Sequence, residues 1–456
     1  MTLATLVVGC SPAENHSDIV INNVTVIDAA SEPRPQRSVV VRNDKIFAVN
    51  PALSTEAAAA ENVIDATDKY LIPGLWDMHV HFLYEPKLTE HMADLFLQYG
   101  VTSVRDTGGN LEELVKLRER LRQRARPTPR VYFSGPLLDG QFPVYDGSDP
   151  ARPALGIDVA TRAAAHARVK ALKAAGADLI KIYELVQPDV YQALVDAARS
   201  ENLPIASHVP LMLTADQAGP LADSMEHLRN IELACASNWR DLLQQRQATF
   251  TAFTEGLGYD LRRSLHSAQR LPAIAAYDEN RCNTVLDTLQ NTTQVPTLRL
   301  NTVFQEQPWH REDWPQALAG LPQDVIKQWQ SQIDFVSNSA APPDRRFADW
   351  SMFLISRLLA RQVPVAAGTD TPIGLGIPGY SLHTELELLV AGGMTNQQAL
   401  HAATIAPTKF FSNSDAMGRI APGMVADLVL LDANPLQDIR NTRRIEAVIV
   451  DGAWVN

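Results

Sequence analysis

The sequence is poor in the features that mark several protein classes. It has only three cysteines in 456 residues and no Cys-x-x-Cys pair, which argues against a disulfide-framed fold and a cysteine-rich zinc module. It also lacks a long Lys/Arg cluster and carries a formal net charge of −12, so nucleic acid and anionic membrane surfaces are not expected partners. No segment reaches the ~18 unbroken apolar residues of a transmembrane helix. With 46% hydrophobic and 20% charged residues, the composition fits a soluble globular protein with a large core.

The first residues resemble the end of a bacterial lipoprotein signal. Met1–Gly9 is apolar and rich in small residues, and it leads directly into Cys10, the residue that such signals lipidate. We therefore expect residues 1–17 to be a signal remnant and membrane tether of an exported, periplasmic or outer-membrane-attached protein. The stretch is short and has no positively charged start, so an ordinary cysteine in a cytoplasmic protein is the alternative. Export would allow Cys235 and Cys282 to form a disulfide, a pairing that the sequence leaves open.

Both ends of the chain show the alternation of apolar and polar residues that is typical of short β-strands. The pattern occurs several times in residues 18–73 and returns in residues 413–456, with turn residues between the runs. Because the two regions are alike and flank a long middle part, we expect them to combine in one small β-sandwich domain.

The middle of the chain, residues 74–412, alternates between strand-like and helix-like segments. Helical patterns such as Asn110–Arg124, Ala160–Ala175 and Pro188–Ser200 separate short apolar runs. Such alternation predicts an α/β fold with a parallel sheet, and eight βα units predict a (β/α)8 TIM-like barrel. The eight expected strands are Leu75–His81, Thr102–Asp106, Arg130–Ser134, Leu179–Tyr183, Ile205–His208, Met225–Leu228, Thr297–Asn301 and Val363–Thr369.

Two connections between the later strands carry large insertions. Residues 229–294 and 302–361 are too long for plain βα loops, and both contain helix-like, polar-rich sequence. Each follows the carboxyl end of an expected strand, where barrel active sites are built, so we expect them to be lid elements over the site.

The first chemical signal is the run His79-Val80-His81 at the end of the first expected strand. Residues two apart in a strand point to the same side, so both imidazoles project together. Imidazole is a common ligand of zinc and related metals, and barrel sites lie at this end of the strands. Two histidines on a polar strand face are the alternative interpretation.

Lys181 is the second signal, because it lies within an otherwise apolar expected strand, Leu179–Tyr183. Burial of a lysine is costly and lowers its pKa. A neutral amine can react with carbon dioxide to form a carbamate, an anion able to bridge two cations. A structural salt bridge across the barrel explains the same residue equally well.

Three further ligand-type residues close later strands. His208 and His227 end two consecutive expected strands, and Asp370 follows the eighth. One such histidine is usually a satisfied core or rim residue, but two of them after a His-x-His run favour a metal site. A carboxylate at Asp370 is suited to hold a metal and to accept a proton from a water molecule that the metal acidifies.

The order of these residues along the strands resembles the binuclear, carboxylated-lysine type of the amidohydrolase superfamily of metal-dependent hydrolases. The resemblance covers nearly the whole chain. The segments that carry it are Leu71–His81, Gly100–Asp106, Ala366–Asp370, Ala399–Thr404 and Gly418–Asp432. The last of these is most similar to the subgroup of imidazolonepropionase-like enzymes and prolidase-like peptidases. Imidazolonepropionases lack the strand-four lysine, so Lys181 favours the peptidase-like side.

The resemblance implies two divalent metal ions, zinc by default, with N6-carboxylysine at Lys181 as the group that bridges them. The other ligands would be His79, His81 and Asp370 for the more buried metal, and His208 and His227 for the second. A bridging hydroxide would attack the substrate carbonyl, and Asp370 would pass the proton to the leaving nitrogen.

We therefore expect a hydrolase that cleaves an amide or peptide-like C–N bond in a small substrate, a dipeptide or an N-acyl amino acid. The same binuclear site would also serve a cyclic amidase, a lactonase or a phosphotriesterase. A non-catalytic surface lipoprotein that binds a metal or ligand is the remote alternative. The sequence leaves the metal identity and a homo-oligomeric state open.

Peptidase-like relatives often carry Gly-Gly-His after the third strand and an aromatic residue soon after the strand-five histidine. Both features help to hold a substrate carboxylate. This chain has Gly135–Gln141 and His208-Val209-Pro210 at those places. It therefore lacks both of these features for binding a carboxylate.

Three other residues are candidates for contacts with the substrate. Tyr183 lies on the same side of its strand as Lys181, and barrel packing is its alternative role. Arg105 is a candidate for contact with an anionic group, although a structural ion pair with a neighbouring acid is favoured. His383 opens the helix after strand eight, where it would line the site or serve as an ordinary helix residue.

Overall fold

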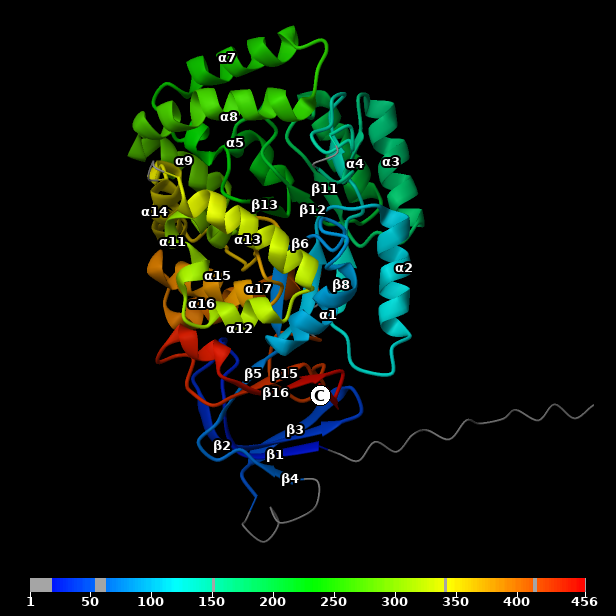
Figure 1. Ribbon diagram of the computed structural model, residues 1–456, viewed down its shortest axis with the longest axis vertical. Coiled ribbons are helices and arrows are strands. Elements are labelled where there is room, and N and C mark those ends of the chain that lie inside the picture. Colours follow the sequence, from blue (N-terminus) through cyan, green and yellow to red (C-terminus); the bar gives the residue numbers. More distant parts are fainter. Residues whose placement is uncertain (1–18, 54–62, 150–151, 340–342, 413–415, 456) are drawn as a thin grey trace, which may run out of the picture.

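The computed structural model describes residues 19–53, 63–149, 152–339, 343–412 and 416–455, and it shows an α/β protein (Figure 1). No helix within these ranges combines the length and the apolar character that a membrane crossing needs. The expected tether with Cys10 lies outside the described residues and stays a prediction.

Strands from both ends of the chain join in one eight-stranded sheet, drawn at the bottom of Figure 1. Its members are β1 (Ile19–Val26), β2 (Arg34–Arg42), β3 (Lys45–Pro51), β4 (Val63–Asp65), β5 (Tyr70–Pro73), β15 (Leu428–Leu431), β16 (Ile445–Val450) and β17 (Ala453–Trp454). The two chain ends meet where β5 pairs antiparallel with β15, with Leu428 opposite Pro73. Ile21, Val39 and Leu428 are buried in a core that belongs to this sheet.

The middle of the chain supplies the parallel strands that position the site, so the expected alternation of parallel strands and helices is confirmed. The three-stranded sheet has the order β6 (Leu75–Val80), β7 (Val101–Asp106) and β8 (Arg130–Phe133). The six-stranded sheet has the order β10 (Gly156–Asp158), β9 (Leu137–Asp139), β11 (Ile180–Ile182), β12 (Ile205–Ser207), β13 (Ser224–Glu226) and β14 (Thr293–Val295). Isolated parallel bridges join Gln294 to Val365 and Val80 to Thr371, so residues 365–371 lie between β14 and β6.

Helices that connect the strands begin where the sequence provides a cap. The Asn110 side chain accepts a hydrogen bond from the Glu113 N–H and starts α2, and Thr161 caps α3 in the same way. Pro188 opens α4, a position where the missing N–H costs nothing. The helices outside the two insertions are α1 (Thr89–Gln98), α2 (Leu111–Arg122), α3 (Arg162–Ala174), α4 (Pro188–Ser200), α5 (Ala215–Ala218), α10 (Leu298–Asn301), α15 (Tyr380–Ala391), α16 (Asn396–Ala402) and α17 (Ile405–Phe410). The three helical segments expected from the sequence are confirmed.

The prediction of the seventh strand at Thr297–Asn301 was wrong. The strand lies earlier, as β14, and the expected residues form the short helix α10. Thr297 has a left-handed backbone with φ 47°, which ends the extended run. The buried Glu385 carboxylate then accepts hydrogen bonds from the N–H groups of Leu298 and Arg299, at 2.9 and 2.8 Å, and so caps the new helix.

The eighth expected strand, Val363–Thr369, is present only as the isolated bridges described above. Pro364 has no N–H to donate to a strand ladder, which limits regular pairing there. The segment nevertheless packs closely against β6 and β14. A Cβ atom on Gly368 would lie 2.5 Å from the Val295 side chain and 3.0 Å from the His79 nitrogen, so only glycine allows this approach.

Both insertions are helical. The first contains α6 (Ile231–Ala234), α7 (Trp239–Ala252), α8 (Gly258–Ala275) and α9 (Glu279–Thr288), and the second contains α11 (Val303–Glu306), α12 (Trp314–Ala319), α13 (Gln323–Ser337) and α14 (Arg346–Ala360). Helices α7 and α8 lie at the end of the molecule opposite the sheet made by the chain ends (Figure 1). A disulfide joins Cys235, at the end of α6, to Cys282 in α9, which settles the pairing that the sequence left open.

Candidate functional site

The six predicted metal ligands lie at or just beyond the carboxyl ends of the parallel strands. His79 is in β6 and Lys181 is in β11, while His208 and His227 directly follow β12 and β13. Asp370 is in the segment between β14 and β6. None of the six side chains is more than about one-twentieth exposed; they are His79, His81, Lys181, His208, His227 and Asp370. The topology thus gathers residues from distant parts of the sequence at one buried place.

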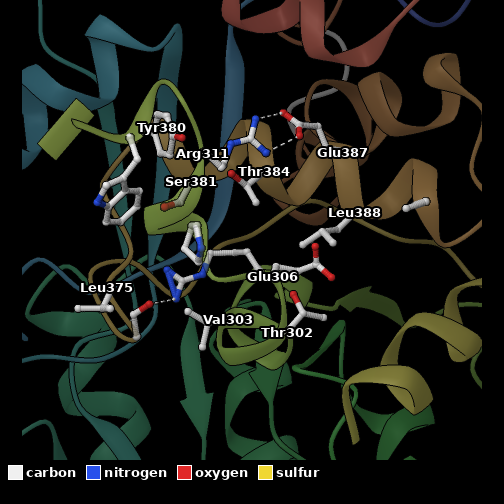
Figure 2. A pocket seen from close by; sticks show the side chains of 15 residues that line it. Thr302, Val303, Glu306, Arg311, Leu375, Tyr380, Ser381, Thr384, Glu387 and Leu388 are labelled. Carbon is white, nitrogen blue, oxygen red and sulfur yellow. Dashed lines mark hydrogen bonds and ion pairs between the residues drawn. The ribbon is translucent and has the colours of Figure 1, made fainter. Parts of the chain in front are cut away.

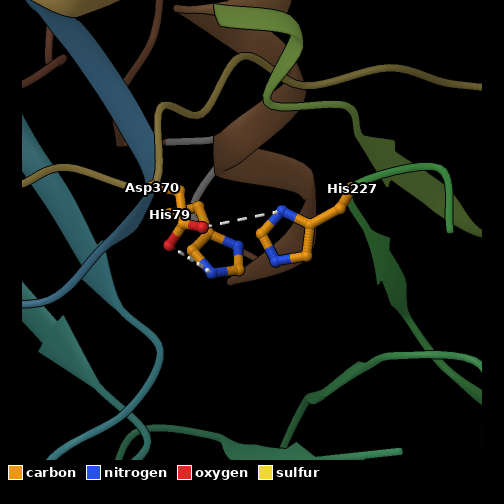
Figure 3. Close-up of side chains that lie close together, drawn as sticks. All are labelled: His79, His227 and Asp370. Carbon is orange, nitrogen blue, oxygen red and sulfur yellow. Dashed lines mark ion pairs between the residues drawn. The ribbon is translucent and has the colours of Figure 1, made fainter. Parts of the chain in front are cut away.

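His79, His227 and Asp370 form the centre of the group (Figure 3). One candidate ligand atom from each of them lies within 4.8 Å of the others. His79 Nε2 is 3.5 Å from Asp370 Oδ1, and His227 Nδ1 is 3.9 Å from Asp370 Oδ2. Ligand atoms of these types at such separations are suited to a centre that binds divalent metal ions.

His81 and His208 extend this centre on two sides. His81 Nε2 lies 3.1 Å from Asp370 Oδ1, although this oxygen has no hydrogen bond within the described residues. The His208 ring centroid is 4.8 Å from that of His227. His81 Nε2 and Asp370 Oδ1 thus face each other at a separation that would let both bind one cation.

Lys181 lies beside the same centre, and its amine has no hydrogen-bond partner in the described part of the chain. Its nearest anion is Glu226, with Nζ 4.0 Å from Oε1. Burial, with a smaller effect of the Arg105 charge, lowers the pKa of Lys181 to about 7 against the opposing effect of Glu226. A large share of this amine is therefore neutral near pH 7. An unpartnered, partly neutral lysine amine beside ligand-type side chains fits the carbamate that the sequence suggested.

Three of the histidines are held in the neutral state that a metal requires. Burial lowers the pKa of His79 to about 4, and it holds the pKa values of His208 and His227 well below the usual range. A metal ligand must be a neutral imidazole, so at these three positions no proton has to be displaced at neutral pH. His81 differs, because the Asp370 carboxylate raises its pKa against the effect of burial.

Glu226 is a functional residue that the sequence did not reveal. Its carboxylate accepts a hydrogen bond from His79 Nδ1 at 2.6 Å and from Arg105 Nη2 at 2.8 Å, and it is completely buried. Burial alone would raise the pKa of Glu226, but Arg105 and Lys181 outweigh it and hold that pKa well below its usual range. Glu226 therefore fixes the His79 ring and leaves Nε2 directed to the centre. In the sequence, the position of Glu226 directly before His227 was the one indication that it could take part in the site.

Glu184 plays the same part for His208. Its carboxylate accepts a hydrogen bond from His208 Nδ1 at 2.7 Å, from His266 Nε2 at 2.5 Å and from Arg262 at 2.9 Å. His266 and Arg262 lie on α8, so the first insertion is connected to the site through one carboxylate. Nothing in the sequence links α8 to residue 184.

The other two histidines also have an outer partner. His81 Nδ1 is 3.2 Å from the Gly108 carbonyl oxygen, and His227 Nδ1 is 2.7 Å from the Thr297 hydroxyl. His79, His81 and His208 are therefore oriented through Nδ1, which is typical of histidines that bind metals through Nε2. The Nδ1 atom of His227 contacts Thr297 and also faces Asp370. Thr297 reaches His227 because its left-handed backbone ends β14 at this point.

Backbone conformation and a buried acid place Asp370. His227 and Asp370 have φ angles of 64° and 62°, values that non-glycine residues adopt rarely and mostly at functional sites. Asp77 accepts hydrogen bonds from the N–H and the hydroxyl of Thr369, at 2.9 and 2.6 Å. The Asp370 N–H donates to the His79 carbonyl oxygen at 2.7 Å. These contacts fix the carboxylate relative to the histidines of β6.

Two of the three tentative substrate contacts are engaged in structural interactions, which agrees with the alternative roles expected for them. Arg105 is completely buried and donates to the Met78 carbonyl oxygen, Ser224 and Glu226, so it forms the structural ion pair that the sequence favoured. His383 is also buried, and its two ring nitrogens lie 2.9 Å from the Thr442 hydroxyl and 3.0 Å from the Tyr99 carbonyl oxygen. Neither side chain has a group left for a substrate.

Tyr183 stays a candidate contact. Its ring centroid lies 4.4 Å from that of His208 and 6.0 Å from that of Tyr145, so it borders the predicted ligands. Burial holds the pKa of Tyr183 well above its usual value, so the hydroxyl keeps its proton at neutral pH and can donate a hydrogen bond.

A separate cavity of about 240 Å³ lies between α11 and α15 (Figure 2). Glu387 of its lining accepts hydrogen bonds from Arg311, also of the lining, and from Arg443, both at 2.8 Å. Arg299 lines this cavity and donates to the carbonyl oxygens of Ile373 and Gly374. It thereby supports the chain that follows Asp370.

We expect the Glu226→Gln variant to lose stability. Glutamine keeps the size of the side chain but leaves Arg105 buried without its counter-charge, and breaking a buried pair in this way typically costs about 3–5 kcal/mol. The measurement is urea unfolding of metal-free protein at pH 7. Glu312→Gln, on an exposed side chain, is the matched control. Equal unfolding midpoints for the two variants would contradict the proposed role of the pair.

The sequence was compared with known families and proteins. A family model with the description "Amidohydrolase family" matches residues 133–456. Ochratoxinase from Aspergillus niger is 23% identical over 488 residues, which cover 93% of this chain and 83% of that protein. An adenine deaminase from Desulforamulus reducens is 33% identical over 90 residues, which cover 19% of this chain and only 14% of the deaminase.

Solved structures share the fold over almost the whole chain. A Xaa-Pro dipeptidase with bound methionine matches with a TM-score of 0.69 and 20% identity, over 96% of this chain and 100% of that chain. Bottromycin amidohydrolase matches with a TM-score of 0.70 and 22% identity, over 96% of this chain and 87% of that chain. At such low identity these structures establish a common fold.

Proposed function

Because the chain belongs to the amidohydrolase family and is a hydrolase of C–N bonds, we propose that it cleaves the amide bond of a dipeptide or an N-acyl amino acid. The observation that carries the proposal is Lys181, whose buried amine has no hydrogen-bond partner among the described residues. Its charge interacts with those of His79, His208, His227 and Asp370. This donor set is the one that the resemblance assigned to the peptidase-like enzymes of the superfamily.

We infer that the parallel strands form an eight-stranded barrel. The bridges at Val365 and Thr371 support this, because they connect β14 to β6 through the segment that carries Asp370. We infer in the same way that the sheet of both chain ends is a small sandwich domain with its own core. In a barrel, all the predicted ligands would face one common opening.

The donor set fits two divalent metal ions, with zinc as the default for a site of imidazole and carboxylate ligands. His79, His81 and Asp370 would hold one ion, His208 and His227 would hold the other, and carboxylated Lys181 would bridge them. When bound, such ions polarise a carbonyl oxygen and acidify water.

The chain's own residues supply orientation and proton transfer. Glu226 and Glu184 keep His79 and His208 in the tautomer that leaves Nε2 free. The Asp370 carboxylate has an oxygen without a hydrogen bond in the described residues, so it can take a proton from the attacking water and pass it to the leaving nitrogen. Tyr183, with its protonated hydroxyl, is placed to contact the substrate beside His208.

The names of the relatives support a peptide-like substrate. One of the structures with the same fold is a Xaa-Pro dipeptidase, and another is an amidohydrolase of bottromycin. Their shared fold does not by itself decide the substrate, so we rest the choice on Lys181.

A substrate panel tests the proposal. Zinc-loaded protein should turn over at least some linear dipeptides or N-acetyl amino acids, with the released amine detected by mass spectrometry. The panel also contains hydantoins, lactones and phosphotriesters, which represent the other chemistries open to a binuclear site. Turnover confined to one of these three classes would replace the proposal with that chemistry, and no turnover of any compound would reject it.

A further inference from the structure

A cavity of about 500 Å³ has an unusual charge, and one of its lining residues, His266, is joined to the predicted ligand His208 through the Glu184 carboxylate. Four arginines line the cavity, together with one histidine and a single carboxylate. The lining residues used below are Arg229, Arg262, Arg263, His266, Arg270 and Asp344. The chain as a whole carries a net charge of −12, so a cavity with an excess of arginines stands apart from the rest of the molecule.

Most of these charges already have partners. Arg262 is bonded to Glu184 at 2.9 Å, and the guanidinium of Arg270 lies 3.6 Å from Glu232. Asp344, the lone carboxylate of the lining, is itself bonded by Arg346. Four arginines line the cavity, while the acids that pair with them are Glu184 and Glu232. The positive charge of the lining therefore exceeds the negative charge of these acids.

Arg229 is the arginine with the weakest pairing close to the site. Its nearest anion is Glu184, with the guanidinium 3.9 Å from Oε1, and it makes no hydrogen bond within the described ranges. Glu184 is already engaged by His208, His266 and Arg262. The Arg229 side chain is 18% exposed, so a partner can reach it from the cavity.

Arg229 also lies near the reacting centre. It is two residues beyond His227, and its charge is the second cause, after burial, of the depressed pKa of His227. Tyr183, beside His208, lies under the guanidinium of Arg262 at 5.6 Å from the ring centroid. The charge of Arg229 also helps to hold the pKa of Asp370 below its usual value, so an anionic group held by Arg229 would lie near that carboxylate.

We propose that Arg229 binds the free carboxylate of the substrate, while Arg262 engages Glu184, the nearest anion of Arg229. The proposal rests on the amide-hydrolase function above and specifies its substrate class as amides whose leaving amino acid carries an unblocked carboxylate. Guanidinium pairs with carboxylate in a bidentate, oriented way that an ammonium does not reproduce. Arg229 therefore determines specificity, in place of the motifs for carboxylate binding that this sequence lacks.

The cavity wall also provides surface for a side chain. Tyr259 and Phe347 belong to the lining, and Phe347 is covered by the guanidinium of Arg270 at 4.0 Å. The part of the substrate next to the carboxylate would contact these rings. Amino acids with apolar side chains are accordingly the expected leaving groups.

The test compares each substrate with its own C-terminal amide. The best dipeptide or N-acetyl amino acid from the panel is assayed with zinc-loaded wild type, Arg229→Gln and Arg229→Lys, and cleavage of the same internal bond is followed by mass spectrometry. For the free acid, Arg229→Gln should lower kcat/KM by roughly 30-fold or more, mainly through KM, with partial recovery in Arg229→Lys. For the terminal amide, the kcat/KM values of the three proteins should agree within about threefold, because the amide has no carboxylate charge for Arg229 to pair with.

Arg168→Gln, which removes the same charge from an exposed position on α3, should behave as wild type. Titration calorimetry with the product amino acid gives a readout that is independent of turnover, and binding should weaken in Arg229→Gln alone. Equal losses for acid and amide would show that Arg229 only maintains the Glu184 contacts, and would overturn the proposal. A wild-type enzyme that cleaves both forms equally well would overturn it too, while leaving the hydrolase function intact. Failure of the function itself is distinct, because wild type would then cleave neither form.

Discussion

Replacing Asp370 by asparagine should abolish amide hydrolysis while leaving the protein folded. Asparagine has nearly the same shape, but it cannot accept the proton that the attacking water must lose. Proton transfer by a positioned side chain contributes about 10²–10⁴-fold to a rate, and Asp370 is in addition a predicted metal ligand. We therefore expect kcat/KM to fall by at least about 10³-fold for every amide in the panel.

The measurement needs metal content and structure alongside activity. Metal is determined by elemental analysis after dialysis, and folding is checked by circular dichroism and thermal unfolding. Asp349→Asn, on an exposed residue of α14, is the control for the same chemical change. Activity within about tenfold of wild type in Asp370→Asn would remove Asp370 from the reaction and reopen the assignment of the whole centre.

The central residues could be predicted because their signal is local. Two histidines that alternate in a strand, and a lysine inside an apolar strand, are informative before any contact is known. Parallel strands place their carboxyl ends together, so residues at such ends were expected to meet. The structure brings His79, His227 and Asp370 into one cluster, although nearly 300 residues separate the first from the last.

The residues that hold the centre in place could not be predicted in this way. Glu184 and Glu226 are ordinary acids in the sequence, and their importance comes from partners far along the chain, such as His266 on α8. Arg105 and Arg229 look alike as isolated arginines, yet one is completely buried in an ion pair and the other is left with only a distant anion. The seventh strand was misplaced because its end depends on Glu385, which caps α10 from 87 residues away.

Removing the Lys181 amine should also disable the centre. In a Lys181→Met variant the buried position stays filled, but no carbamate can form and the bridging anion is lost. Changes in the groups that merely support a metal ligand cost 10- to 100-fold in affinity or activity, and a bridging group should exceed that. We expect kcat/KM to fall by more than about 10²-fold and the metal content to drop below two ions per chain.

The pH dependence of metal loading gives an independent check on Lys181. Only the neutral amine can attack carbon dioxide, and the new carbamate then releases a proton to solvent. With the pKa of Lys181 lowered to about 7, the amine is mainly protonated at pH 6 and mainly neutral at pH 8. Metal-free protein supplied with zinc and bicarbonate should therefore regain activity readily at pH 8 and poorly at pH 6.

Two comparisons separate carboxylation from a purely structural lysine. Lys170→Met, at an exposed position on α3, should load metal and react as wild type at both pH values. In Lys181→Ala, a short carboxylic acid such as propionate can enter the space left by the side chain, and it should restore part of the activity because it replaces the bridging carboxylate. A wild type that loads zinc equally well without carbon dioxide, together with a Lys181→Ala variant that propionate does not rescue, would leave Lys181 as a salt-bridge partner of Glu226. The choice of a peptide-like substrate, which depends on the carbamate, would then lose its main support.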